Sequence, residues 1–326
     1  MKQQLNSTDK RKSQPDTMKF CFSNASCRPE CQRLTLLMAA AALLFCTARN
    51  FAANAPELPP LSTVRGSPHL PGKFVWADLV TDDLMAAQKF YTELFGWKFY
   101  DYGGYLIGMN DDRPLCGMFH RPRPADQSAK PRWIGFISVS NVERAQKAVT
   151  KAGGRVLAPP QKMPKRGEQA VFADPEGALF GAVKSSSGDP EDFLAAPGDW
   201  IWIQLLSRDA RKAAEFYRSV AGYEIVSNTQ SNRLSDYVLT SEGYARATVR
   251  TIQTDDEKVR PLWLPFVRVR NINDSVAKAK QLGGKVLIEP KRELFDGKVA
   301  LIADPTGAAI GIMEWPEGLE KGSHKP

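Results

Sequence analysis

The 326-residue sequence has few of the side chains that most often build reactive centres. Its three histidines are His69, His120 and His324, which lie far apart in the chain. Because zinc and non-haem iron need three or four converging donors, a histidine-rich metal centre is disfavoured. Cys116 is the only cysteine after residue 50, so the body of the protein can form no internal disulfide. The sequence also lacks a nucleophile elbow, a phosphate-binding loop and a dinucleotide-binding fingerprint.

Excess charge of one sign is also missing from most of the chain. The net charge is +8, of which +5 belongs to residues 1–70 and +3 to the remainder. No basic stripe is present, so nucleic acid is not an expected partner. The apolar fraction of 43% and the charged fraction of 25% are ordinary for a globular protein, and the length suffices for two domains.

The N-terminus has the pattern of a targeting segment. Residues 34–45 (LTLLMAAAALLF) are too short to cross a bilayer comfortably and are typical of a signal-peptide core. Basic residues precede this run, and Cys46-Thr47-Ala48 fits cleavage after Ala48. We therefore expect residues 1–48 to be a signal peptide or membrane anchor, with lipidation of Cys46 as the alternative to cleavage. The protein is then exported to the periplasm or envelope of a bacterium, and touches a membrane only through this segment.

Residues 49–71 are rich in proline, serine and small residues. This composition is typical of a flexible tether.

The rest of the chain is an internal repeat. Residues 74–99 (FVWADLVTDDLMAAQKFYTELFGWKF) align without gaps with residues 200–225 (WIWIQLLSRDARKAAEFYRSVAGYEI). Residues 133–160 align in the same way with residues 263–290, and the two stretches close on ADPEGALFGAV and ADPTGAAIGIM. A repeat of this length predicts a duplicated architecture.

Each repeated stretch predicts a strand, a helix and two or three further strands. Apolar residues alternate with other residues along residues 74–80, which predicts a strand. After each cap residue, apolar residues recur at the spacing of a helix. The expected caps are Asp83, Asn141, Asp209 and Asn271. Asp-Pro-x-Gly turns at residues 174–177 and 304–307 connect the last two strands of their modules. The Phe-Tyr pairs at residues 90–91 and 216–217 lie on helix faces and are interpreted as packing residues.

This order of motifs resembles the vicinal oxygen chelate (VOC) superfamily of glyoxalase, bleomycin-resistance and extradiol-dioxygenase proteins. The shared pattern is AA-x-x-FY-x-x-x-x-G after a strand, with DP-x-GA-x-[FI]-G at the end, and it is most similar to the two-domain glyoxalase-related subgroup. The resemblance implies an α+β fold of four βαβββ modules, paired into two glyoxalase-like domains that each form a cup. We expect domain 1 at residues 72–187, a linker at 188–197, domain 2 at 198–317 and a tail at 318–326.

The resemblance also indicates where a metal would bind. Each family module offers one ligand near the start of its first strand and another on its last strand. In this sequence those positions hold Trp76, Ile134, Trp202, Leu264, Gly181 and Gly311. Because none of these side chains can donate to a metal, we expect no metal and no other cofactor.

Strand alternation then predicts which residues face the cups. If the family's ligand positions face inward, so do the residues two positions further along each strand. This gives six expected ligand-binding residues: Trp76, Asp78, Ser138, Trp202, Gln204 and Arg268. An aromatic wall with a few polar groups suits a small, partly aromatic or carbonyl-bearing molecule.

Asp78 is the single candidate catalytic residue. A carboxyl group in an apolar cup has a raised pKa and can act as a general acid or base. The alternative is that Trp76 and Trp202 are core residues and that Asp78 lies at a solvated rim. The basic loop at residues 162–166 (KMPKR) is interpreted as solvated, with a lid over the first cup as the alternative.

Three functions remain open. The first is an exported protein that binds a small molecule without the family metal. The second is a metal-independent or degenerate lyase or isomerase related to lactoylglutathione lyase. The third is a structural or partner-binding envelope protein whose cups are closed.

Overall fold

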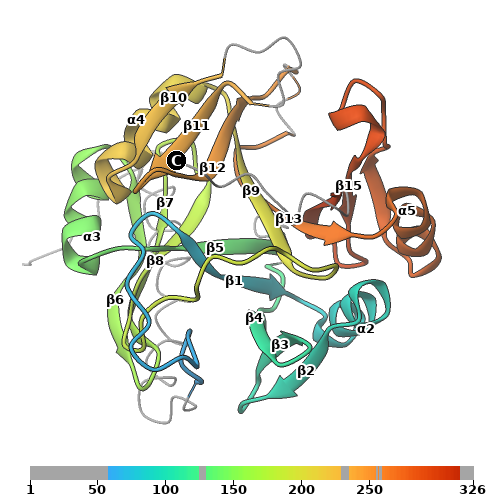
Figure 1. Ribbon diagram of the computed structural model, residues 1–326, viewed down its shortest axis with the longest axis horizontal. Coiled ribbons are helices and arrows are strands. Elements are labelled where there is room, and N and C mark those ends of the chain that lie inside the picture. The colour runs from blue at the N-terminus through green and yellow to red at the C-terminus, as the bar shows by residue number, and fades with distance from the viewer. Residues whose placement is uncertain (1–57, 125–129, 229–234, 255, 257–258, 316–326) are drawn as a thin grey trace, which may run out of the picture. The chain divides into compact units, whose positions relative to one another are not determined.

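The computed structural model describes residues 58–124, 130–228, 235–254, 256 and 259–315. The predicted signal segment at residues 1–48 and the tail at residues 318–326 lie outside these ranges. Within the described part, no helix has the length and apolar character needed to cross a membrane. The described residues form two eight-stranded sheets with helices, consistent with two glyoxalase-like domains (Figure 1).

The first domain consists of two βαβββ modules that share one sheet. Its strand order is β2-β3-β4-β1-β5-β8-β7-β6, in which β1 runs parallel to β4 and antiparallel to β5. The elements are β1 (Phe74–Thr81), α2 (Leu84–Phe95), β2 (Lys98–Asp101), β3 (Tyr105–Asn110), β4 (Arg113–His120), β5 (Arg132–Ser138), α3 (Val142–Lys151), β6 (Arg155–Met163), β7 (Gly167–Ala173) and β8 (Leu179–Ser185).

The second domain repeats this topology. Its strand order is β10-β11-β12-β9-β13-β16-β15-β14. The elements are β9 (Trp200–Ser207), α4 (Ala210–Ala221), β10 (Glu224–Ser227), β11 (Tyr237–Ser241), β12 (Tyr244–Thr251), β13 (Leu262–Val269), α5 (Ile272–Gln281), β14 (Lys285–Ile288), the short 3-10 helix η1 (Phe295–Gly297), β15 (Val299–Ala303) and β16 (Ala309–Glu314).

The four helices begin at the residues that the sequence predicts as caps. The side chains of Asp83, Asn141, Asp209 and Asn271 each accept a hydrogen bond from the backbone N–H three residues later, at 2.6–3.0 Å. Each cap satisfies one of the backbone donors that a helix start leaves free. Helices α2 and α4 end at Gly96 and Gly222, whose positive φ angles of 80° and 76° suit glycine.

The two domains pack through their helix-bearing faces. One buried cluster joins α3 of the first domain to α4 of the second, and another joins α2 to α5 (Figure 1). The same pairing places glycines against aromatic rings, because a side chain on Gly154 would meet Phe216 and one on Gly284 would meet Phe90. The interpretation of the Phe-Tyr pairs as packing residues is therefore confirmed.

Two matching hydrogen-bond networks cross the domain boundary. The Tyr91 hydroxyl donates to Asp304 Oδ2 at 3.0 Å and accepts from Trp133 Nε1 at 3.0 Å. In the equivalent network, with the roles of the domains exchanged, Tyr217 donates to Asp174 Oδ2 at 3.1 Å and accepts from Trp263 Nε1 at 2.8 Å. Both aspartates belong to the Asp-Pro-x-Gly turns and also hold those turns through their other oxygen.

The remaining apolar clusters lie on the opposite faces of the sheets. Alternation along β1 places Ala77 and Leu79 in the helix-side cluster, whereas Trp76 and Val80 belong to a separate one. That second cluster also includes Tyr105 and lines what we call the first cup. The second cup contains the corresponding cluster around Leu264, Phe266, Trp202 and Trp315.

The tyrosine networks allow a stability test. Tyr217→Phe leaves the Trp263 indole N–H and Asp174 Oδ2 without a partner in a buried site. Losing a buried partner costs about 1–3 kcal/mol, so the free energy of unfolding in urea should fall by about that amount. Tyr91→Phe should cost about as much, because its contacts are equivalent. Tyr100→Phe, at a residue that is 53% exposed, should have little effect. A Tyr217→Phe protein as stable as that control would contradict the role assigned to the networks.

Candidate functional site

Asp78 lies at the centre of the first cup, on β1, and is only 7% exposed. Its Oδ1 atom accepts hydrogen bonds from Trp76 Nε1 at 2.8 Å and from the Tyr105 hydroxyl at 2.5 Å. Burial raises the pKa of Asp78, while the hydrogen bonds from Tyr105 and Trp76 and the positive charge of Arg166 lower it in part. The structure therefore brings two of the predicted residues, Trp76 and Asp78, into one buried polar network.

The third member of this network, Tyr105, is not among the residues that the sequence predicts for the site. Its side chain crosses the sheet from β3 over Gly117 on β4, which is paired with Asp78. A Cβ atom on Gly117 would lie 1.8 Å from the Tyr105 hydroxyl and 2.3 Å from Asp78 Oδ1. The contact between Tyr105 and Asp78 therefore requires glycine at position 117.

Arg166 adds a buried positive charge to the first cup. It is 2% exposed, and its guanidinium carbon lies 4.1 Å from the centre of the Trp76 ring. None of its three guanidinium nitrogens has a hydrogen-bond partner among the described residues. Burial lowers the pKa of Arg166, and the neighbouring Tyr105 and Asp78 oppose that change. The interpretation of residues 162–166 as a solvated loop is wrong for Arg166, because the hairpin between β6 and β7 turns this side chain inward.

Part of the predicted tether covers the first cup. Leu58 and Leu61 are 5% and 2% exposed and belong to the same apolar cluster as Trp76, Tyr105 and Phe136. The expectation of a flexible tether therefore does not hold for residues 58–61, whose leucines pack on the domain.

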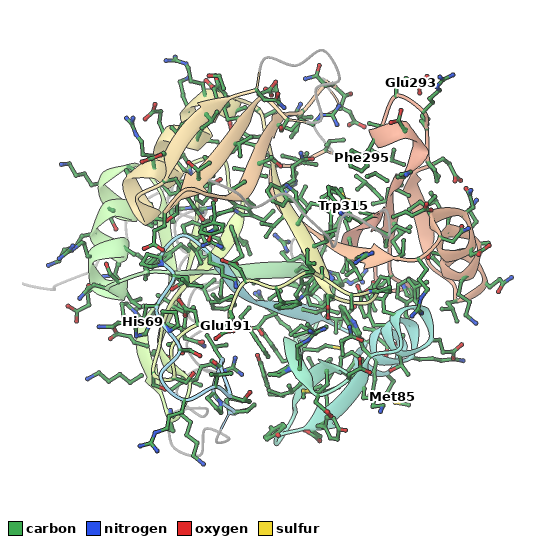
Figure 2. All side chains as sticks on the ribbon, viewed as in Figure 1. His69, Met85, Glu191, Glu293, Phe295 and Trp315 are labelled. Carbon is green, nitrogen blue, oxygen red and sulfur yellow. The ribbon has the colours of Figure 1, made fainter. Side chains whose placement is uncertain are left out.

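The second cup has a neutral version of the network. Thr248 occupies the place of Gly117 in the sheet, because it pairs with Gln204 as Gly117 pairs with Asp78. The Thr248 hydroxyl accepts from Trp202 Nε1 at 2.9 Å and from Gln204 Nε2 at 3.2 Å. Phe295 and Trp315 stack in this cup with ring centres 5.6 Å apart (Figure 2).

Ser138 and Arg268, the other two predicted residues, fasten the segment between the domains. Ser138 Oγ donates to Asp189 Oδ2 at 2.5 Å, near the start of the predicted linker. The Arg268 guanidinium donates to the carbonyl oxygens of Ala195, near the linker's end, and of Trp315. The structure therefore separates these two residues from the tryptophan networks.

A cavity of about 490 Å³ brings Trp76 and Trp202 to one site between the domains. Phe74, Trp200 and the linker residue Phe193 also line it. Strand alternation predicts the two tryptophans in separate cups. It does not predict the shared cavity, because alternation within a strand gives no information on how the two domains pack.

Charged groups gather on one side of this cavity around Asp192. Its carboxylate accepts from Arg246 Nη1 at 2.8 and 2.9 Å and lies 3.0 Å from Lys73 Nζ. Nε of Arg246 is buried and has no hydrogen-bond partner among the described residues. Two cations thus share the Asp192 carboxylate beside an aromatic wall, and Glu191 also lines this cavity.

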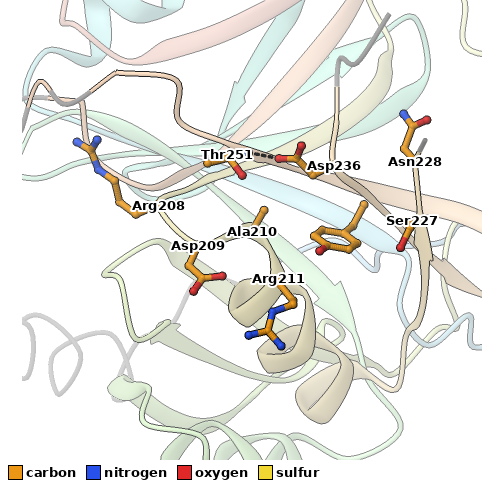
Figure 3. Close-up of a pocket in the computed structure, with 9 residues that line it drawn as sticks. Arg208, Asp209, Ala210, Arg211, Ser227, Asn228, Asp236 and Thr251 are labelled. Atoms are coloured by element: carbon orange, nitrogen blue, oxygen red, sulfur yellow. Dashed lines mark hydrogen bonds between the residues drawn. The ribbon is translucent and has the colours of Figure 1, made fainter. Parts of the chain in front are cut away.

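A second cavity, of about 480 Å³, lies at the start of α4 (Figure 3). Its polar groups already serve the fold. Asp209 caps α4, Asp236 accepts from the Thr251 N–H at 2.6 Å, and Arg208 donates to the carbonyl oxygens of Thr254, Asp256 and Val259. It is therefore a weaker candidate site than the aromatic cavity between the domains.

The cups do not fit the metal that the VOC family usually carries. The described residues include no group of three or more His, Cys, Asp or Glu side chains placed to hold a metal ion. At the last-strand positions, a Cβ atom on Gly181 or Gly311 would lie 2.2 Å from the ring of Phe136 or Phe266, respectively. These rings fill the space where a family ligand would project.

Comparison with known proteins agrees with the fold. Residues 73–181 and 201–312 match the Glyoxalase/Bleomycin resistance protein/Dioxygenase superfamily, and the chain belongs to this family. Among solved structures, it is similar to the Mn(II)-bound glyoxalase from Novosphingobium aromaticivorans, with a TM-score of 0.52, 15% identity, and coverage of 76% of this chain and 82% of the other. The 2,3-dioxygenase LapB from Pseudomonas sp. KL28 gives a TM-score of 0.51 at 14% identity, over 79% and 98% of the two chains.

Curated relatives are more similar in sequence. "Anthracycline biosynthesis protein DauV" of Streptomyces sp. (strain C5) is 30% identical over 263 residues, which cover 76% of this chain and 94% of the relative. "Putative glyoxylase CFP32" of Mycobacterium bovis (strain ATCC BAA-935 / AF2122/97) is 27% identical over 245 residues, which cover 73% and 93%.

The buried carboxyl group predicts a pH-dependent difference in stability. Asp78→Asn keeps an oxygen that can accept from Trp76 and Tyr105 but removes the buried charge. Because folding raises the pKa of Asp78, the folded protein takes up this proton at a higher pH than the unfolded chain. The wild type should therefore be the less stable protein at neutral pH. The difference should shrink as the pH falls through the raised pKa, and should vanish below the ordinary carboxyl pKa.

Urea unfolding of both proteins between about pH 3 and about pH 8 measures this difference. Asp112→Asn, at an exposed position, is the matched control. A constant difference between wild type and Asp78→Asn over the whole range would show that Asp78 is not the buried titrating group.

Proposed function

We propose that the protein binds a small, partly aromatic or carbonyl-bearing molecule in the cavity between its two domains, without the family metal. The observation that carries the proposal is the presence of Trp76 and Trp202 in one cavity of about 490 Å³. Small-molecule sites are commonly aromatic-lined cavities of about 300–1,000 Å³ at domain interfaces, with a few polar groups that orient the ligand.

The chemistry of the walls supports this class of ligand. Flat aromatic rings gain contact area by stacking on tryptophan, and the positive groups around Asp192 favour a carbonyl or anionic oxygen. The buried Arg246 Nε is a donor that such an oxygen would satisfy. The name of the Streptomyces relative, which places that protein in anthracycline biosynthesis, supports testing polycyclic aromatic ketones first.

A metal-independent lyase or isomerase is the second candidate. The pair formed by Asp78 and Tyr105 supports it, because a buried carboxyl group with a raised pKa is suited to proton transfer near neutral pH. The binding function ranks first because Leu58 and Leu61 cover this pair, whereas the cavity between the domains is already formed. The glyoxylase name of the mycobacterial relative makes methylglyoxal–glutathione adducts the substrates to test.

Binding can be tested with 9,10-anthraquinone-2-sulfonate, a soluble polycyclic ketone, by quenching of tryptophan fluorescence. Phe193 lines the cavity and is 49% exposed, so Phe193→Ala removes a wall with little cost to folding. We expect Phe193→Ala and Trp202→Ala each to weaken binding by roughly tenfold, which corresponds to about 1.4 kcal/mol. Treatment of the protein with EDTA should leave the affinity unchanged.

The neighbouring residue provides the matched control. Leu194 is 66% exposed and does not line the cavity, so Leu194→Ala should bind the probe like the wild type. Equal weakening by Leu194→Ala, or loss of binding in EDTA with recovery on adding a divalent metal, would contradict the proposal. Failure of the wild type to bind any polycyclic ketone would favour a structural or partner-binding role.

We also propose that the protein is exported to the periplasm or envelope of a bacterium. The apolar run at residues 34–45, its basic lead-in and the small residues up to Ala48 support this proposal. Cell fractionation should find the processed protein outside the cytoplasm. N-terminal sequencing should then locate the cleavage after Ala48, or show a blocked, lipidated Cys46. Full-length protein in the cytosol would contradict export.

A further inference from the structure

The buried guanidinium of Arg166 is not explained by the fold. A buried charge without a hydrogen-bonded partner is costly, and native proteins rarely keep one without a reason. No ion pair joins Arg166 to Asp78 or to any other described residue, and its nitrogens have no hydrogen-bond acceptor there. The Trp76 ring covers one face of the guanidinium, but its donors lie in the plane of the group and stay unused.

The segment that covers the first cup is weakly attached. Residues 58–61 (LPPL) include two prolines, which have no backbone N–H, and no hydrogen bond joins this stretch to the described residues. The chain is fastened only from Ser62 onward, where its N–H donates to Ser187 Oγ at 3.1 Å and its hydroxyl lies 2.6 Å from Ser67 Oγ. Residues 58–61 are held in the cup by packing, chiefly of the buried Leu58 and Leu61 side chains.

We propose that the first cup is a binding site for a ligand with a single carboxylate, which Arg166 recognises, and that residues 58–61 must leave the cup for the ligand to enter. The site adjoins the cavity between the domains, because Trp76 and Leu61 line that cavity as well, but Arg166 and Asp78 do not line it. The proposal does not rest on the function assigned to that cavity. Residues 58–61 and the ligand then compete for the same space in the first cup.

The residues around Arg166 favour a carboxylate over other anions. A planar guanidinium binds a carboxylate through two parallel hydrogen bonds, which would satisfy donors that are now unpaired. The carboxylate of Asp78 lies in the same cup, and its charge disfavours a ligand with two negative charges, such as a phosphate ester. The apolar side chains of Ile107 and Phe136 suit a hydrophobic ligand body.

In the second domain, the position equivalent to Arg166 holds no cation. The repeat aligns Arg166 with Asp296, which lies exposed in η1 with a φ angle of 52°. The proposal therefore predicts one carboxylate site per chain, in the first domain.

The test uses the full-length chain and two probes of equal shape, 1-naphthoate and the neutral 1-naphthamide. Leu58→Ser combined with Leu61→Ser should open the cup and increase the affinity for 1-naphthoate, measured by calorimetry, by about tenfold or more, because the covered state no longer competes. Addition of Arg166→Met, which keeps an unbranched side chain of similar reach, should return the affinity to that of the wild type. Phe193→Ala should not change 1-naphthoate binding to the opened cup, which separates this site from the cavity.

Three results would overturn the proposal. These are an opened variant that binds 1-naphthoate no better than the wild type, one whose affinity for 1-naphthamide increases equally, and one that keeps its increased affinity after Arg166→Met. If the double serine variant does not fold, hydrogen exchange of the wild type decides: 1-naphthoate should speed exchange of the Ser62 amide, whose hydrogen bond to Ser187 Oγ adjoins the displaced segment, and Arg166→Met should abolish this effect. Unchanged exchange in the wild type would equally refute the proposal.

Discussion

Two equivalent tyrosine–aspartate hydrogen bonds cross the apolar boundary between the domains and tie each domain to a turn of the other. Asp174 and Asp304 each use one carboxylate oxygen to hold their own turn and the other to accept from a tyrosine of the opposite domain. A change in either turn therefore disturbs the boundary between domains as well as the local strand connection. The tyrosine of the Phe-Tyr pair in each domain bonds to the aspartate of the Asp-Pro-x-Gly turn in the other domain. This explains why both domains carry both motifs.

Because the helices pack at this boundary, the surfaces that remain for the proposed ligands are the outer faces of the sheets and the cavity beside the linker. There the two domains have diverged. In the first, glycine at position 117 allows Tyr105 to reach a buried carboxylate, and Arg166 supplies a buried cation. In the second, Thr248 accepts from Trp202 and Gln204 in a neutral network. The duplication has thus kept the packing contacts and changed the polar centre of one cup.

The modules, the helix caps and the inward-facing Trp76 and Asp78 could be predicted because they depend on local signals, namely strand alternation and cap chemistry. Tyr105, Arg166 and Leu61 could not. Tyr105 lies on a strand whose register is set by pairing across the sheet, and Arg166 follows two exposed residues in a basic loop. Leu61 lies in a proline-rich stretch whose composition is typical of a tether. Their places are decided by tertiary packing, which outweighs local propensity wherever apolar surface remains to be covered.

Two of the positions that hold metal ligands in the family are packed directly against aromatic rings in this protein. A single substitution there would therefore not restore a metal ligand. Restoring a carboxylate at position 181 would force its side chain into the Phe136 ring, with which the strand is directly paired. The same holds for position 311 and Phe266. A metal ligand at position 181 or 311 would thus require a second change, at Phe136 or Phe266, and these aromatic rings make the cups more apolar. In such surroundings a buried cation without a hydrogen-bonded partner interacts more strongly with an anion than it would in water, which is why the proposed carboxylate site depends on Arg166.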